Sequence, residues 1–77
     1  MKSAIELYII SEVKKRRKKL KMSQRYIADC LNVSRSFIRD IEDLKKDSAY
    51  NVDHINQLAR IFECSPRLLW PEKPLWS

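Results

Sequence analysis

The stretch QRYIADCLNVSRSFIRDIED, residues Gln24 to Asp43, decides the fold of this chain. Apolar residues recur within it at helical spacing, first over residues 27–31 and again over residues 33–41. Each run gives one apolar stripe, which is typical of a short amphipathic helix. Asn32 stands between the two runs, and the chain contains no glycine. Because Asn is the residue after Gly that best adopts a left-handed backbone conformation, the stretch predicts two packed helices with a tight turn at Asn32.

The second of these helices, residues 34–43, is expected to carry a polar outer face. Ser34 is suited to cap its start, because a serine hydroxyl accepts a hydrogen bond from a free backbone N–H of the first turn. When Ile38 and Ile41 face inward, the rotation of about 100° per residue directs the polar side chains outward. These polar residues are Arg35, Ser36, Arg39, Asp40 and Asp43. A helix with such a face fits the major groove of B-DNA, but an ordinary solvent-exposed helix would show the same pattern.

The motifs of this stretch resemble those of a known family. MSQ precedes the first helix, IADCL contains a small Ala, LNVS stands where the family usually has L-G-V-S, and S-x-x-I-x-x-I-E follows. Together they are similar to the helix-turn-helix of the phage Cro/repressor type, also called the XRE family, from about Ile9 to Trp70. The resemblance implies a compact all-α domain of five helices, like the lambda-repressor DNA-binding domain, with the helix-turn-helix at residues 23–43.

Length and charge are compatible with a small DNA-binding domain. The chain of 77 residues is expected to form a single domain, residues 1–77. A chain this short buries only about 60% of its unfolded surface, so it can hold a small core but not a deep catalytic cavity. Sixteen Lys and Arg against ten Asp and Glu give a net charge of +6. This charge favours nucleic acid or an anionic membrane surface over catalysis at an acidic site.

Residues that usually carry catalysis or bind metals are sparse. Cys30 and Cys64 are too few and too far apart for a zinc site, and we expect both to be reduced. His54, the only histidine, has no acid–base partner at a suitable spacing. We therefore expect no enzyme activity, no cofactor and no metal. With no signal peptide and no run of the ~20 apolar residues that span a bilayer, a cytoplasmic location without membrane contact is expected.

A basic run, KKRRKKLK, covers residues 14–21, where seven of eight side chains are positive. Cations at a helix C-terminus complement its dipole, but so many like charges repel one another. A DNA backbone would offset that repulsion, and a solvated helix face is the alternative. The resemblance pairs Arg17 with Glu42 and so gives Arg17 a structural role. The lysines left for phosphate contact are Lys14, Lys18 and Lys21.

Four segments begin with the same pattern. An apolar residue comes directly before a capping residue, and a second apolar residue lies four positions after the cap. This pattern is the hydrophobic staple of a helix start. The capping residues are Ser23, Ser34, Asn51 and Ser65. Together with the helix that precedes residue 21, they predict five helices. The fourth is expected over residues 52–62, with Val52 and Leu58 on its core face, and the pattern also places Cys64 in the core.

Further phosphate contacts are expected at the start of the first helix of the pair and in the loop after the second. Family members hold a phosphate with the Gln that matches Gln24, aided by the helix N-terminus; a first-turn Gln without a ligand is the alternative. In the family, the loop after Glu42 presses its backbone N–H groups against phosphates. Leu44 replaces the usual Gly there, a departure that bears on the path of this loop. The phosphate candidates in these two regions are Ser23, Gln24, Arg25, Lys45 and Lys46.

The last residues, 71–77, form a short tail with large apolar side chains. Two prolines keep it out of a helix. Trp70, Leu75 and Trp76 either fold back onto the core or form a dimer surface. Family members often dimerise through this end, which places two recognition helices about one DNA turn, ~34 Å, apart. A homodimer is therefore expected.

The sequence thus predicts a sequence-specific, repressor-like regulator that inserts the helix 34–43 into the major groove of double-stranded DNA. Arg prefers guanine O6 and N7, and Asp can accept from cytosine N4, which predicts a G·C-containing half-site. The residues expected to contact bases are Arg35, Ser36, Arg39 and Asp40. The alternative is a protein-interaction module of the same fold, such as an antitoxin whose toxin partner would occupy the apolar tail. An RNA-binding role would rest on charge alone.

Overall fold

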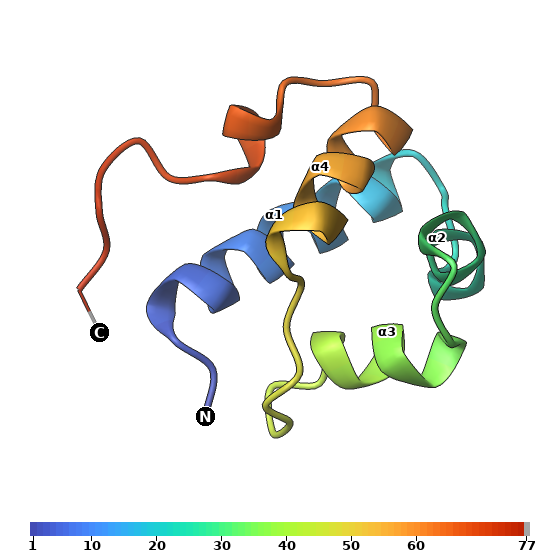
Figure 1. Cartoon of the computed structure of the whole chain (residues 1–77), viewed down its shortest axis with the longest axis horizontal. Coiled ribbons are helices and arrows are strands. Elements are labelled where there is room, and N and C mark those ends of the chain that lie inside the picture. The colour runs from blue at the N-terminus through green and yellow to red at the C-terminus, as the bar shows by residue number, and fades with distance from the viewer. Residues whose placement is uncertain (77) are drawn as a thin grey trace.

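Four α-helices and one 3₁₀ helix make up residues 1–76, the part of the chain that the computed structural model describes (Figure 1). They are α1 (Ala4–Lys19), α2 (Gln24–Leu31), α3 (Arg35–Glu42), α4 (Val52–Ile61) and η1 (Pro66–Leu69). These residues contain no strand, so the all-α prediction is confirmed. Ser77, the last residue of the predicted tail, lies outside the described residues.

The fifth helix differs in kind from the prediction, because it is a single 3₁₀ turn. Pro66 begins it, and Pro71 follows one residue after its C-cap. A proline disfavours the helical conformation of the residue before it, so only four residues are left between Ser65 and Trp70. Bonds from residue i to i−3 can be closed over so short a segment, as from the Trp70 N–H to the Arg67 carbonyl at 3.2 Å.

The starts of α2, α3 and α4 have the caps that the sequence predicts. The side-chain oxygens of Ser23, Ser34 and Asn51 each accept a hydrogen bond from the backbone N–H three residues later, at 3.0, 3.0 and 2.7 Å. Ser65 makes no such bond. Asn32 closes the turn between α2 and α3 in the left-handed conformation, with φ 58° and ψ 45°. The predicted turn is confirmed.

The start of α1 has a capping box that was not among the predicted helix starts. The Ser3 hydroxyl accepts from the Glu6 N–H at 3.2 Å, and the Glu6 carboxylate accepts from the Ser3 N–H at 2.8 Å. A serine followed three residues later by a glutamate is the sequence signature of this cap. The signal was therefore available in the sequence.

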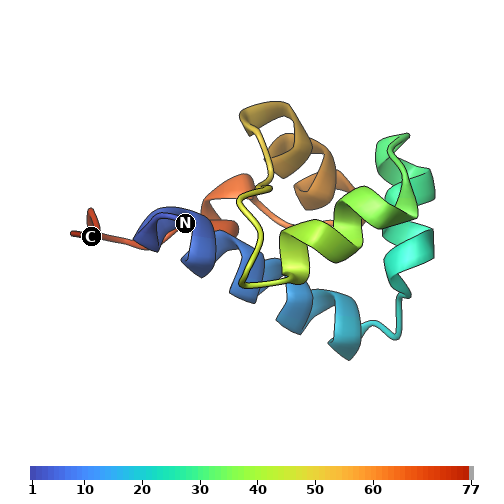
Figure 2. The ribbon, with the colours of Figure 1, turned by 90° about the horizontal axis from the view of Figure 1, so that it is seen from below.

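The core is shared by all the helical elements. The fully buried side chains are Val13, Ile27, Ile38, Ile41, Leu58 and Leu69. Because α1, α2, α3, α4 and η1 each contribute to this set, no helix can shift without disturbing the others. Figure 2 and Figure 1 both place α2 and α3 at one end of the molecule and the C-terminal tail at the other.

The prediction that Val52 belongs to the core is wrong, because this residue is 73% exposed. Val52 is the first residue of α4, and Tyr50, two positions earlier, is buried in its place at 8% exposure. The Tyr50 ring meets the His54 ring edge-on with centroids 6.3 Å apart. Cys64 packs against the core as predicted.

Candidate nucleic-acid interface

The polar face of α3 points away from the core. Ile38 and Ile41 are completely buried, which fixes the rotation of the helix and turns its opposite side to solvent. The predicted base-contacting residues lie there: Arg35, Ser36 and Arg39 are exposed and Asp40 is half-buried. One helix therefore presents two guanidinium groups, a hydroxyl and a carboxylate on its outer side.

The turn at Asn32 keeps α3 close to α2. The Val33 N–H donates to the Ala28 carbonyl at 3.0 Å, which closes the end of α2. Ala28 is 1% exposed, and its small side chain leaves room for the neighbouring helix. α2 thus supports α3 on its inner side while the outer side stays open.

A buried ion pair ties the end of α3 to α1. Arg17 Nε and Nη2 donate to the two carboxylate oxygens of Glu42 at 3.0 and 2.8 Å. The two side chains are only 10% and 4% exposed. Arg17 Nη1 also donates to the Met22 carbonyl at 3.0 Å, just before α2. A bidentate, charge-assisted contact of this kind fixes orientation as well as distance, so the pair that the resemblance implies holds α3 against α1.

Gln24 takes part in the same network. Its Nε2 donates to Glu42 Oε1 at 3.1 Å, so the carboxylate orients the side chain that is predicted to hold a phosphate. The second N–H and the oxygen of this amide are available for other contacts. No helical spacing relates position 24 to position 42, so the sequence did not predict this bond.

The basic end of α1 lies next to the loop that follows α3. Lys14 and Lys18 border a groove of about 550 Å³ that is also lined by Glu42 and Leu44. The structure therefore brings the α1 lysines to the same side as the start of this loop. The other exposed residues predicted to contact phosphate are Lys21, Ser23, Arg25, Lys45 and Lys46.

The loop after α3 uses two of its own backbone N–H groups. The Lys45 N–H donates to Asp43 Oδ1 at 2.9 Å, and the Lys46 N–H donates to the Asp43 carbonyl at 3.0 Å. The family resemblance implied that N–H groups of this loop contact phosphates, but these two are bound within the loop. The lysine side chains, which are exposed, are the groups that can reach a DNA backbone.

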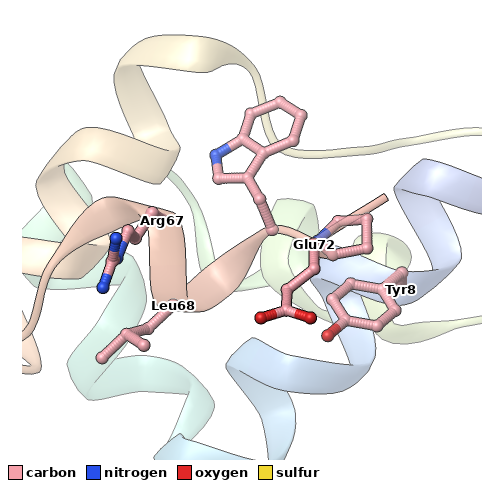
Figure 3. Close-up of a pocket in the computed structure, with 6 residues that line it drawn as sticks. Tyr8, Arg67, Leu68 and Glu72 are labelled. Atoms are coloured by element: carbon pink, nitrogen blue, oxygen red, sulfur yellow. The ribbon is translucent and has the colours of Figure 1, made fainter. Parts of the chain in front are cut away.

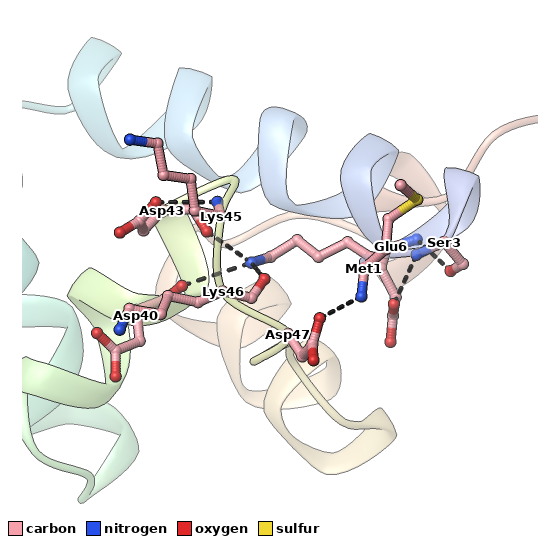
Figure 4. Close-up of polar contacts among 9 residues, drawn as sticks. Met1, Ser3, Glu6, Asp40, Asp43, Lys45, Lys46 and Asp47 are labelled. Carbon is pink, nitrogen blue, oxygen red and sulfur yellow. Dashed lines mark hydrogen bonds and ion pairs between the residues drawn. The ribbon is translucent and has the colours of Figure 1, made fainter.

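The C-terminal end of α3 is held by a residue from the beginning of the chain (Figure 4). Lys2 Nζ donates to the Asp43 carbonyl at 2.8 Å and to the Asp40 carbonyl at 3.4 Å, and it also bonds the Lys46 carbonyl. Lys2 is only 4% exposed. No sequence pattern pointed to this contact, because it joins positions about 40 residues apart through backbone acceptors that any residue carries.

A second contact from the N-terminus reaches the same loop. The Met1 ammonium bonds the Asp47 carboxylate (Figure 4). The hydrogen bond from this ammonium, and then its charge, lower the pKa of the Asp47 carboxyl. Both groups are exposed, so solvent screens the pair.

The histidine, the buried tyrosine and the exposed cysteine form no catalytic arrangement among the described residues. His54 Nδ1 accepts from the Asn51 N–H at 3.2 Å, and its ring lies 5.7 Å from that of Phe37. Burial raises the pKa of Tyr50, which therefore stays neutral. Cys30 is an exposed free thiol at the surface of α2. Over residues 1–76, no group of three or more His, Cys, Asp or Glu could hold a metal ion. In the same range, no helix combines the length and the apolar character needed to cross a membrane.

The apolar tail runs away from α2 and α3 (Figure 1). Trp76 is 94% exposed, and Trp70 and Leu75 are 40% and 42% exposed. Trp76 therefore does not fold back onto the core, whereas Trp70 and Leu75 are partly covered. Next to the tail, α1 and η1 border a groove of about 530 Å³ (Figure 3). It is lined by Tyr8, Arg67, Leu68, Trp70, Pro71 and Glu72.

Two short helices packed through a left-handed turn, with an exposed arginine-bearing face, define a helix-turn-helix DNA-binding regulator. A family profile described as helix-turn-helix matches residues 13–69, which is most of the chain. The chain belongs to this family, of the XRE type that the sequence resembles. No curated protein and no solved structure matches the chain.

Proposed function

We propose that this protein is a sequence-specific transcriptional regulator of the repressor type, which inserts α3 with its cap, residues 34–43, into the major groove of DNA. The observation that carries the proposal is the outward face of α3. Arg35, Ser36 and Arg39 are exposed there, while Ile38 and Ile41 anchor the opposite side in the core. A helix held rigidly on one side can place its other side against base edges.

The chemistry of this face favours particular bases. Each arginine can donate two hydrogen bonds to guanine O6 and N7. Asp40 either accepts from cytosine N4 or orients one of the two arginines, and its half-buried position is compatible with both roles. The proposal therefore includes a G·C-containing half-site.

Phosphate contacts would position the helix in the groove. Gln24 is held by Glu42 at the start of α2, where free backbone N–H groups and the helix dipole attract an anion. The exposed side chains of Lys14, Lys18, Lys21, Ser23, Arg25, Lys45 and Lys46 would supply the other contacts. These contacts carry affinity but no base preference.

The experiment that separates base contacts from phosphate contacts measures the binding affinity of Arg39→Ala and of Lys18→Ala. Each variant is tested on the preferred duplex and on an unrelated duplex of equal length. Arg39→Ala should cost about 1–3 kcal/mol on the preferred duplex and little on the other. Lys18→Ala should weaken both equally and reduce the slope of log K against log salt by about one unit. Arg60→Ala, which removes an exposed arginine from α4, is the matched control. If Arg39→Ala weakened both duplexes equally, α3 would not read bases.

The tail supports a homodimer as part of the same proposal. Trp76 at 94% exposure is a large apolar side chain that a second copy would cover, and Trp70, nearer the start of the tail, lines the groove between α1 and η1. A two-fold dimer would bind two half-sites about one DNA turn apart.

The same exposed tail is the observation that favours a second candidate function. In an antitoxin, a toxin partner rather than a second copy would cover Trp70, Leu75 and Trp76. Co-purification from the native host separates the two: a specific protein partner lost in Trp76→Ser supports the antitoxin, and self-association lost in the same variant supports the homodimer.

A further inference from the structure

The end of α3 differs from the ends of the other α-helices. A left-handed residue follows the last turn of α1 at Lys21, of α2 at Asn32 and of α4 at Glu63, with φ of 59°, 58° and 53°. Such a residue lets backbone N–H groups return to the last carbonyls of the helix. α3 ends instead at Asp43 in an extended conformation, φ −88° and ψ 113°. Only the Asp43 N–H returns to a carbonyl of the last turn, that of Asp40 at 3.2 Å, which leaves carbonyl lone pairs there for another donor.

Lys2 supplies that donor. Its ammonium has three N–H groups, and it has three carbonyl partners, on Asp40, Asp43 and Lys46. A lysine that is 96% buried would be unfavourable without such partners, and the negative end of the α3 dipole stabilises its charge further. The contacts span the last turn of α3 and the loop beyond it.

We propose that Lys2 is a positioning residue of the DNA interface, which fixes the loop 43–46 relative to α3. This inference rests on the proposed function, because it concerns the same surface. Without the Lys2 ammonium, the loop would keep the Asp43 contacts to the Lys45 and Lys46 N–H groups and the exposed contact of Met1 with Asp47. The side chains of Lys45 and Lys46 would then no longer be held at a fixed position relative to α3. From that position they reach phosphates when α3 lies in the major groove.

The test compares Lys2→Met, which keeps the aliphatic stem and removes the three donors, with Lys15→Met. Lys15 is an exposed lysine of α1 whose ammonium pairs with Glu12 and not with the loop carbonyls, so this control loses the same charge and keeps the hydrogen bonds of the loop. In the free protein, amide hydrogen exchange at Lys46 should accelerate in Lys2→Met and stay unchanged in Lys15→Met. This measurement needs no DNA.

DNA binding is then measured at several salt concentrations, with Lys45→Ala/Lys46→Ala as a second change. Lys2→Met should lower the slope of log K against log salt by up to about two units, the value expected for two lost phosphate contacts. Adding the two alanines should lower it no further. Two results would overturn the inference. One is that Lys2→Met and the two alanines lower the slope additively, and the other is that Lys2→Met accelerates exchange at Lys46 but leaves the slope unchanged. In both cases Lys2 would support the fold without positioning Lys45 and Lys46.

Two further outcomes are kept apart by this design. If Lys2→Met does not fold, Lys2→Arg is measured, since it keeps the charge and alters the donor geometry. Exchange at Lys46 and the salt slope that change together, or that both keep wild-type values, support the inference, and a change in one without the other contradicts it. If the wild-type protein binds no duplex, the proposed function fails and the interface role of Lys2 fails with it. Exchange at Lys46 still reports separately whether Lys2 holds the loop.

Discussion

The two ends of α3 are secured in different ways. At the start, the Ser34 hydroxyl accepts from the Phe37 N–H, three residues away in sequence. At the end, Lys2 and Arg17 reach in from the beginning of the chain, Lys2 to the carbonyls of the last turn and Arg17 to the Glu42 carboxylate. A local cap forms with the helix itself, whereas the distant contacts require the whole domain to be folded. The C-terminal end of α3 is therefore held by residues that lie outside the helix-turn-helix.

The largest effect is expected from breaking the distant support at Arg17. Arg17→Met leaves the Glu42 carboxylate, only 4% exposed, without its charged partner, and loss of one member of a buried pair costs about 3–5 kcal/mol. The free energy of unfolding, measured by urea denaturation, should fall by this amount. The double variant Arg17→Met/Glu42→Leu should recover part of it. A loss below about 1 kcal/mol, the range of surface pairs, would contradict the view that this pair secures α3.

A smaller effect is expected from removing the local cap. Ser34→Ala should destabilise the protein by about 1 kcal/mol, since the Phe37 N–H then keeps only the Ser34 carbonyl at 3.2 Å as its acceptor, and Ser34→Gly by only a few tenths. Ser65→Ala is the matched control, because the Ser65 hydroxyl makes no cap bond. Equal losses in Ser34→Ala and Ser65→Ala would show that the cap geometry does not explain the effect.

The smallest effect concerns the exposed contact of the N-terminus with the loop. The hydrogen bond from the Met1 ammonium lowers the pKa of the Asp47 carboxyl, so ionised Asp47 stabilises the folded state. This contribution should be present above the ordinary carboxyl pKa of about 3.9 and be lost as the pH falls through the lowered value. Comparing the unfolding of wild type and Asp47→Asn across pH measures it. A difference that grows on acidification would contradict the assignment.

The contrast between local and distant contacts also explains what the sequence could predict. The helix starts at Ser23, Ser34 and Asn51 and the turn at Asn32 follow from interactions within four residues, and all four were predicted. The Ser3–Glu6 box was equally local and could have been recognised. The pairing of Arg17 with Glu42 came only from the family resemblance, since no periodicity links positions 25 residues apart.

The remaining features depend on tertiary structure. Lys2 binds backbone carbonyls, which leave no mark in the sequence of the residues that carry them. Val52 is exposed because α4 begins at this residue, at the edge of the core. Its apolar side chain had led to the prediction that it is buried. The one-turn length of η1 could have been inferred from the spacing of Pro66 and Pro71. Sequence therefore predicts the polar face of α3 and, through the family resemblance, its pair with α1, while the contact from Lys2 becomes visible only in the folded structure.

The most direct test of the central claim is selection of duplexes from a random pool by the wild-type protein and by Arg39→Ala, each at two salt concentrations. If the outer face of α3 reads base edges, the wild type enriches G·C-containing half-sites, paired about one DNA turn apart if the protein binds as a dimer. Arg39→Ala then loses the preference at one position of each half-site while still binding in a salt-dependent way. A wild-type pool that stays random while protein remains bound would contradict the claim, because the arginines of α3 would then contribute only charge.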